Sequence, residues 1–204
     1  MIELDQKDGL WTVTLNRPDK ANSLTALMLQ ELVGIAKSAQ NARALILTGR
    51  GKVFSAGADL NEARAGLAVS PVWEELSGAL AALPCLTIAA LNGTLAGGAM
   101  GMALACDVRI CVPGAKFFYP VMKLGFLPQP SDPGRMAQLI GPARTKLLLM
   151  GGQKITADEA YAFGLVDRIV TEDVCAAAQD IAADTLAAKP EIAVGIKALC
   201  EPNG

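Results

Sequence analysis

The segment CLTIAALNGTLAGGAMGMALA, residues 85–105, decides the fold class of this chain. Its first seven residues form a mostly apolar run that predicts a buried strand, and the small residues at 96–105 predict a helix. Between them, Asn92 and Gly93 mark a turn. Residues 107–112 predict another strand. Strand, helix and strand in this order are typical of an α/β protein with right-handed crossovers and a largely parallel sheet.

The segments on either side extend this pattern. Residues 10–15 alternate with period two and predict a half-buried strand, whereas residues 25–40 carry apolar residues at helical spacing. Residues 43–48 predict another short strand, and from Pro120 onward the signals are mainly helical. Because no repeat, low-complexity tract or linker interrupts the chain, we expect one α/β domain over residues 1–204 with a helical C-terminal part.

The composition argues against several classes of function. The chain has 204 residues, a net charge of −2 and no basic run, which argues against nucleic-acid binding. Its most apolar window is broken by proline, asparagine and glycines, so it lacks the roughly 20 uninterrupted apolar residues of a membrane helix. Histidine is absent, which excludes a Ser-His-Asp protease and Cys-His catalysis.

The cysteines indicate a reducing compartment. They are odd in number and lack the CxxC spacing of a zinc site: Cys85, Cys106, Cys111, Cys175 and Cys200. This pattern predicts reduced core residues and no metal site. The N-terminal segment is charged and has no apolar signal stretch, so we expect a cytoplasmic protein.

Two stretches rich in small residues carry the functional signal. Residues 53–60 follow one predicted strand and residues 92–101 follow another, each at a place where a helix is about to begin. Backbone N–H groups at such a place favour negative charge, and small residues let a ligand approach the backbone. Two converging N–H groups would make an oxyanion hole for acyl chemistry. Either stretch taken alone fits tight strand–helix packing equally well.

The neighbouring motifs make the pattern more specific. They occur in a fixed order along the chain: NRPDKANSL at residues 16–24, FSAGADL at 54–60, Asn92-Gly93 with Ala96-Gly97-Gly98, and Cys106-Asp107 with Arg109. This set resembles the crotonase superfamily, the enoyl-CoA hydratases and isomerases, and the resemblance covers residues 2 to about 200. It implies a spiral of ββα units at residues 1–140 and a helical region at 141–204, shortened relative to the superfamily.

The resemblance also implies a ligand and an assembly. By position, the N–H groups of Ala58 and Gly98 correspond to the oxyanion hole that holds the thioester carbonyl of an acyl-CoA substrate. Four residues correspond to part of the CoA-binding surface: Lys20, Ser23, Ala56 and Leu60. Lys20 fits a solvated loop lysine equally well. No cofactor is implied besides the CoA thioester itself, and members assemble as homotrimers or hexamers that act as lyases or isomerases in fatty acid metabolism.

The sequence departs from the hydratase pattern at the acid and base positions. The two glutamates that handle water in hydratases correspond here to Gly101 and Val121, and a third acidic position of some relatives corresponds to Gln129. We therefore expect a pocket lined by these three residues and very little ordinary hydratase activity.

Two other residues are candidates for moving a proton. Asp132 is the nearest remaining carboxylate, although Ser131-Asp132-Pro133 is more typical of a helix cap followed by a first-turn proline. Tyr119 could donate a hydrogen bond into the pocket, although a buried structural tyrosine explains it more simply. Two hypotheses follow: an enzyme that acts on an acyl-CoA through a stabilised enolate, or a non-catalytic acyl-CoA-binding or assembly subunit.

Overall fold

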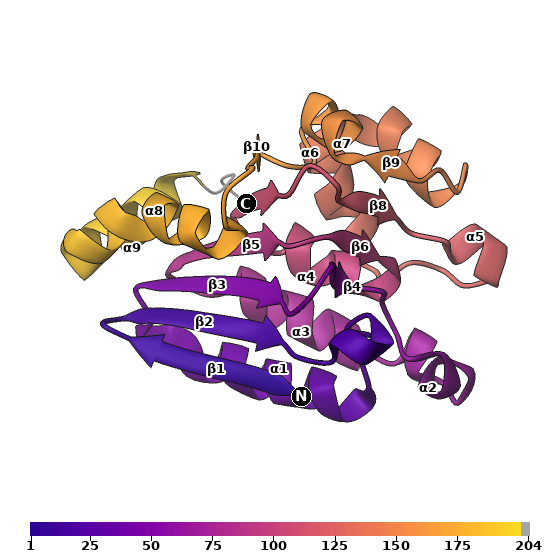
Figure 1. Ribbon diagram of the computed structural model, residues 1–204, viewed down its shortest axis with the longest axis horizontal. Helices are drawn as coiled ribbons and strands as arrows, with labels where there is room; N and C mark the ends of the chain where they lie inside the picture. The colour runs from indigo at the N-terminus through magenta and orange to yellow at the C-terminus, as the bar shows by residue number, and fades with distance from the viewer. Residues whose placement is uncertain (201–204) are drawn as a thin grey trace.

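The computed structural model, which describes residues 1–200, is built on two β-sheets (Figure 1). The larger sheet has the strand order β1-β2-β3-β5-β7-β10, and the smaller has the order β4-β6-β8-β9. The strands of the larger sheet are β1 (Ile2–Lys7), β2 (Leu10–Leu15), β3 (Ala44–Gly49), β5 (Leu86–Leu91), β7 (Val108–Cys111) and β10 (Arg168–Ile169). The strands of the smaller sheet are β4 (Val53–Ser55), β6 (Thr94–Ala96), β8 (Lys116–Phe118) and β9 (Ile155–Thr156). Neighbouring strands run parallel except in the pairs β1/β2 and β8/β9, so the predicted α/β class is confirmed.

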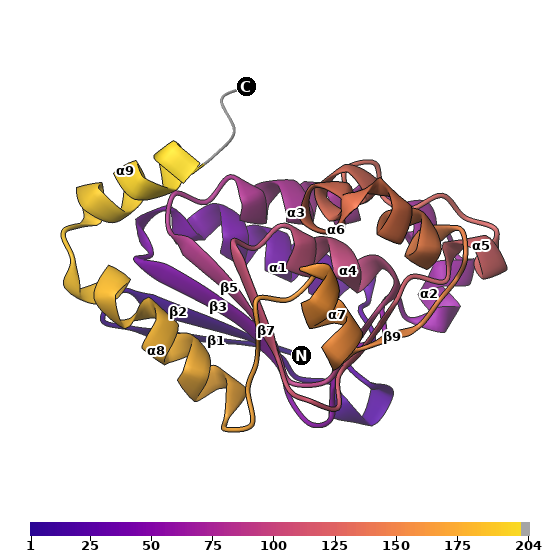
Figure 2. The same ribbon diagram turned by 90° about the horizontal axis from the view of Figure 1, so that it is seen from above.

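Helices cover both faces of the larger sheet (Figure 2). The helices α1, α3 and α4 lie on one face, and α8 lies on the other. The helices are α1 (Ala26–Ser38), α2 (Leu60–Arg64), α3 (Val72–Ala81), α4 (Met100–Leu104), α5 (Val121–Leu124), α6 (Asp132–Leu149), α7 (Ala157–Phe163), α8 (Val174–Ala187) and α9 (Pro190–Cys200). No helix within residues 1–200 combines the length and the apolarity that a bilayer crossing requires.

Strand β3 shows why the sheet is buried on both faces. Its side chains alternate between the two faces, as the period of a strand dictates. Leu45 and Leu47 pack in the large core beside α1 and α3, whereas Ala44 and Ile46 pack in the smaller core beneath α8. An apolar run without alternation is therefore the correct signature for this strand, because parallel sheets bury both faces.

The chain repeats one unit three times. In each unit, a strand of the larger sheet is followed by a turn, a short strand of the smaller sheet and then one or two helices. The pairs are β3 with β4, β5 with β6, and β7 with β8, and they stack in the same order in both sheets. The spiral of ββα units that the resemblance implies is thereby confirmed. The implied boundary between residues 140 and 141 falls at a kink inside α6, where Gly141 has φ 78° and precedes Pro142.

The turns within successive units are packed against each other. The Asn92 side chain accepts a hydrogen bond from the Gly49 N–H (3.0 Å) and donates one to the Gly51 carbonyl (2.9 Å). A Cβ at Gly93 would overlap the carbonyl oxygen of Lys52, so this position requires glycine. These contacts hold β4 and β6 side by side, which determines where their following loops emerge.

One predicted element differs from the structure. The helix expected at residues 96–105 begins only at Met100, because Ala96 is the last residue of β6 and pairs with Phe118 of β8. Small residues do not distinguish a three-residue strand from the first turn of a helix, so the tertiary pairing decides.

Candidate active site

Two glycine-containing loops meet at one edge of the smaller sheet. Strands β4 and β6 are parallel neighbours, so the loops that follow them leave the sheet on the same side. Gly57 (φ 91°) and Gly97 (φ 59°) have left-handed backbone conformations that glycine adopts without strain. A Cβ at Gly57 would lie 2.9 Å from the Ala96 carbonyl oxygen and 3.3 Å from the Gly97 Cα. The two loops are thus in backbone contact, and a side chain at Gly57 would force them apart.

A third segment fixes the first loop from its other side. Leu24 forms an isolated parallel bridge with Ala58, in which the Leu24 N–H donates to the Gly57 carbonyl and the Asp59 N–H donates to the Leu24 carbonyl (both 2.8 Å). In this bridge the hydrogen bonds use the residues on either side of Ala58, so the Ala58 N–H is directed away from Leu24. Gly98 lies in the first turn of a short 3₁₀ helix, where backbone N–H groups have no intrahelical acceptor.

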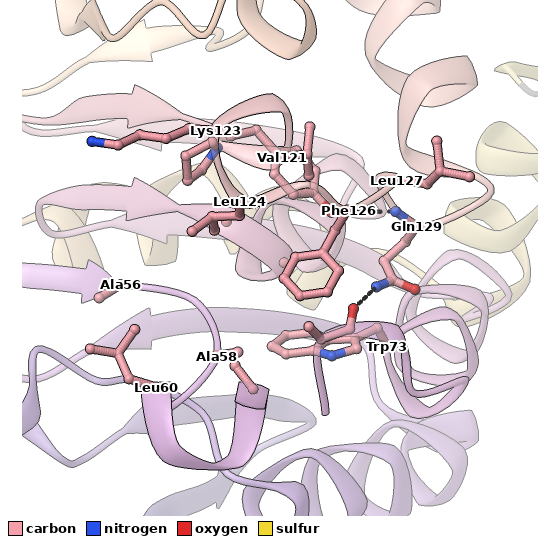
Figure 3. A pocket seen from close by; sticks show the side chains of 16 residues that line it. Ala56, Ala58, Leu60, Trp73, Val121, Lys123, Leu124, Phe126, Leu127 and Gln129 are labelled. Carbon is pink, nitrogen blue, oxygen red and sulfur yellow. Dashed lines mark hydrogen bonds between the residues drawn. The ribbon is translucent and has the colours of Figure 1, made fainter. Parts of the chain in front are cut away.

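Ala58 and Gly98 line the same cavity, which has a volume of about 350 Å³. Figure 3 shows Ala56 and Leu60 on one side of it and the Trp73 and Phe126 rings toward the other. The lining residues are Ala56, Ala58, Leu60, Ala63, Ala68, Trp73, Gly97, Gly98, Tyr119, Pro120, Val121, Lys123, Leu124, Phe126, Leu127 and Gln129. Lys123 is the one charged residue in this set, so the cavity suits an apolar group.

The four residues expected to bind CoA fall into two groups. Ala56 and Leu60 line the cavity, whereas Lys20 and Ser23 lie outside its lining. Lys20 is exposed at the end of a short 3₁₀ helix. The carbonyl and hydroxyl oxygens of Ser23 accept hydrogen bonds from the Arg17 guanidinium at 3.0 and 3.1 Å. The structure therefore places Lys20 and Ser23 on the segment that flanks the cavity loop.

Arg17 is a contributor to this region that the sequence did not single out. Besides Ser23, its guanidinium binds the Asp59 carboxylate at 2.8 Å. This hydrogen bond lowers the pKa of Asp59 below its ordinary value. Asp59 also accepts a hydrogen bond from the Asn61 N–H at the start of α2 (3.1 Å). Arg17 therefore ties the flanking segment to the loop that carries Ala58.

Gly101, Val121 and Gln129 were expected to line the pocket in place of acidic residues, but they do not all line the cavity. Val121 and Gln129 line the cavity, but Gly101 does not. Gly101 is buried in α4, and a Cβ there would lie only 2.7 Å from the Asp132 Oδ1 atom. The expectation that Gly101 lines the pocket is corrected, because the Asp132 carboxylate covers the face of α4 at this residue.

Asp132 does not act as a helix cap. Helix α6 begins at Asp132 with Pro133 in its first turn, as expected, but the preceding Ser131 makes no side-chain capping bond. Asp132 is instead completely buried, and its Oδ2 atom accepts a hydrogen bond from the Tyr119 hydroxyl at 3.0 Å. Its Oδ1 atom has no hydrogen-bond partner within residues 1–200. The interpretation as a cap is therefore wrong, since the side chain turns inward rather than toward the helix end.

Burial dominates the electrostatics of this pair. It raises the pKa of Asp132 to about 6, while the Tyr119 hydrogen bond and Arg135 oppose the shift and Glu74 adds to it. Burial and the neighbouring Asp132 also raise the pKa of Tyr119 well above its usual value. Asp132 therefore changes protonation close to neutral pH, whereas Tyr119 keeps its proton.

The raised pKa predicts a pH-dependent stability difference. Because the folded-state pKa of Asp132 (about 6) exceeds its ordinary value of 3.8, ionisation is penalised in the folded state. The stability of the native protein should fall as the pH rises from about 4 through 6, by roughly 3 kcal/mol from this group. Asp132→Asn has no such group, so it should become progressively more stable than the native protein over this range.

Urea unfolding at pH 4.5 and pH 7.5 measures this effect. Asp180→Asn, at an exposed position of α8, is the matched control and should show no such trend. A stability difference between Asp132→Asn and the native protein that stays constant with pH would contradict the assignment.

The cysteines lie away from this cavity. Cys85, Cys106 and Cys111 are buried thiols, and burial raises their pKa to about 11, 12 and 12 respectively. No group of three or more cysteine, aspartate or glutamate side chains within residues 1–200 is arranged to hold a metal ion. No cysteine is among the residues that line the described cavity.

Comparisons with known proteins agree with this geometry. A spiral of ββα units with two glycine-containing loops meeting at an apolar cavity defines a protein of the crotonase class. The family model described as enoyl-CoA hydratase/isomerase matches residues 5–200. YngF of Bacillus subtilis (strain 168), assigned by name to the enoyl-CoA hydratases and isomerases, is 39% identical over 193 residues, which span 89% of this chain and 74% of YngF. The chain therefore belongs to the enoyl-CoA hydratase/isomerase family.

Solved structures extend the likeness. The structure of Pseudomonas aeruginosa DspI superposes with a TM-score of 0.89 at 30% identity, covering 97% of this chain and 85% of DspI. An enoyl-CoA hydratase from Bacillus anthracis superposes with a TM-score of 0.83 at 35% identity, covering 93% of this chain and 78% of that protein. The fold of this chain thus has close counterparts among solved structures.

Proposed function

We propose that this chain binds an acyl-CoA and stabilises negative charge on the thioester oxygen with the backbone N–H groups of Ala58 and Gly98. The observation that carries the proposal is the backbone contact between the two loops at Gly57 and Gly97, beside an apolar cavity. Two fixed donors aimed at one oxygen lower the cost of forming an enolate, because they need no reorganisation when the charge develops.

The surroundings of the cavity fit the two parts of such a ligand. The apolar lining, including Trp73 and Phe126, suits an acyl group. The Ala56 N–H donates to the Ala21 carbonyl (3.0 Å), which joins the cavity loop to the segment with Lys20 and Ser23, and the CoA moiety would lie on this side. CoA enters as part of the substrate, and no other cofactor is required. As the superfamily resemblance implies, we propose a cytoplasmic homotrimer or hexamer that acts as a lyase or isomerase in fatty acid metabolism.

A binding measurement tests the proposal. Saturated acyl-CoA thioesters from acetyl-CoA to decanoyl-CoA are titrated into the native protein in a calorimeter, with free CoA as the reference. At least one thioester should bind more tightly than CoA, because only the thioester offers a carbonyl oxygen and an acyl chain. If none of them binds, the proposed function is rejected.

Ordinary enoyl-CoA hydratase activity should be very low in this protein. The cavity residues Val121 and Gln129 carry no carboxylate, and neither does any other lining residue. One positioned general acid or base is typically worth about 10²- to 10⁴-fold in rate, so the absence of two should leave little turnover. The loss of crotonyl-CoA absorbance measures this activity, and turnover of about 10 s⁻¹, a typical enzyme rate, would contradict the prediction.

A further inference from the structure

The negative charge of the buried Asp132 carboxylate is not compensated by its surroundings. It forms no ion pair within residues 1–200, and one of its two oxygens has no hydrogen-bond donor. A buried carboxylate of this kind costs several kcal/mol unless it is protonated or compensated. A buried carboxylate of this kind beside a cavity residue is a candidate for proton exchange.

The groups around Asp132 come from four parts of the chain. Tyr119 lies between β8 and α5, and Gly101 belongs to α4. Glu74 of α3 accepts a hydrogen bond from the Ser131 N–H at 3.2 Å, and Arg135 of α6 donates to the Ser131 hydroxyl at 2.7 Å. The two charged neighbours, Glu74 and Arg135, thus each form a hydrogen bond with Ser131. Tyr119 is the one side chain that hydrogen-bonds Asp132 within the described residues.

Tyr119 connects this buried carboxylate to the cavity. It is a lining residue together with Gly98 and Val121. Its hydroxyl donates to Asp132 and also accepts a long hydrogen bond from the Gln129 N–H (3.4 Å). Two contacts therefore fix the direction of the hydroxyl, which lies between Asp132 and the cavity residue Gln129.

We propose that Tyr119 is the catalytic residue that moves the proton of the acyl group, and that Asp132 is the positioning residue that exchanges this proton with it. The inference rests on the proposed function, since the substrate is the acyl-CoA held by Ala58 and Gly98. Tyr119 and Asp132 thus take the acid–base role, whereas the resemblance implies glutamates at positions 101 and 121 for that role.

The transfer is balanced without any co-reactant. As the α-carbon of the acyl group loses its proton to the Tyr119 oxygen, the hydroxyl proton of Tyr119 moves to the Asp132 Oδ2 atom. The C–H electron pair becomes the double bond of an enolate, whose negative charge rests on the thioester oxygen. Reversal of both transfers returns a proton to carbon, and return to a different carbon of an unsaturated acyl group gives isomerisation. A concerted transfer is needed because the raised pKa of Tyr119 makes a free phenolate costly.

Exchange of the α-protons for deuterium in D₂O tests the proposal. The tightest-binding saturated acyl-CoA of the calorimetric series is incubated with the protein, and its α-deuterium content is followed by mass spectrometry. The native protein should catalyse the exchange, with a rate that rises through about pH 6 as Asp132 ionises. Tyr119→Phe and Asp132→Asn should each lower the rate by about 100-fold or more while binding stays within about threefold.

The controls separate this role from a structural one. Tyr161→Phe, at an exposed position of α7, and Asp180→Asn should exchange at the native rate. Asp132→Asn should also lose the rise near pH 6, which a merely structural role would not predict. If Asp132→Asn does not fold, Tyr119→Phe alone decides, because it removes only the hydroxyl oxygen.

The outcomes distinguish this inference from the proposed function. Native-rate exchange by Tyr119→Phe, or binding of the thioester without any exchange by the native protein, would overturn the role of the pair while leaving acyl-CoA binding intact. Failure of every thioester to bind would overturn the proposed function and this inference together.

Discussion

Gly98→Val is expected to weaken acyl-CoA binding by about 100-fold or more, which corresponds to about 3 kcal/mol. A Cβ at Gly98 would already lie 3.3 Å from atoms of the Trp73 ring. That ring is buried, and its indole N–H donates to the Leu67 carbonyl at 2.8 Å, so it has little freedom to move aside. The two additional methyl groups of valine would therefore occupy the space beside the Gly98 N–H that the thioester oxygen needs.

Calorimetry of the variant with the tightest-binding acyl-CoA of the series measures this effect. Gly34→Val is the control, because Gly34 lies at an exposed position of α1 with open space around it. Cooperative urea unfolding of both variants would show that they remain folded. Native affinity in a folded Gly98→Val protein would place the acyl-CoA elsewhere.

Gly101→Glu is expected to lower the free energy of unfolding by about 4 kcal/mol or more. Its Cβ would lie 2.7 Å from the Asp132 Oδ1 atom and 3.2 Å from Oδ2, so the two side chains compete for one space. Overpacking of a core typically costs about 1–3 kcal/mol, and burying a second carboxylate beside the first adds several more. Introducing this glutamate alone would thus disrupt the site rather than create a hydratase.

The companion variant makes this prediction specific. Gly101→Glu combined with Asp132→Gly should recover much of the lost stability, because the competing carboxylate is gone. Gly78→Glu in α3, where the glycine has open space around it, is the control and should cost little. Urea unfolding measures all three proteins. Equal stability of the single and double variants would show that Asp132 does not restrict position 101.

Four strands of the larger sheet, β2, β3, β5 and β7, were predictable because they are long enough to show a pattern, whereas β1 at the charged N-terminal segment was not predicted. Residues 10–15 alternate and form β2, and the apolar run at residues 85–91 forms β5 apart from its first residue. The short strands β4, β6 and β8 have three residues each, which is too few for a periodicity to appear. Their positions depend on pairing between units that are distant in the sequence.

The loops of the site were predictable, whereas the Asp132 environment was not. Small residues after a strand mark a close backbone approach in the sequence itself, and Gly57 and Gly97 have that role in the structure. The sequence around Asp132 is more typical of a helix cap than of an inward-facing carboxylate, and the contact of Asp132 with position 101 spans 31 positions. A glycine within a helix does not by itself reveal this contact, because the helical glycines Gly34 and Gly78 have open space around them.

Infrared difference spectroscopy tests the central claim most directly. The tightest-binding acyl-CoA is prepared with ¹³C at the thioester carbonyl, and its stretching band is compared in solution and in the complex. Two N–H groups from Ala58 and Gly98 should polarise the carbonyl, so the account predicts a band at lower frequency in the complex than in water. A bound thioester whose carbonyl band is not shifted to lower frequency would contradict the account, because the acyl-CoA would then bind without the two N–H groups that define the proposed site.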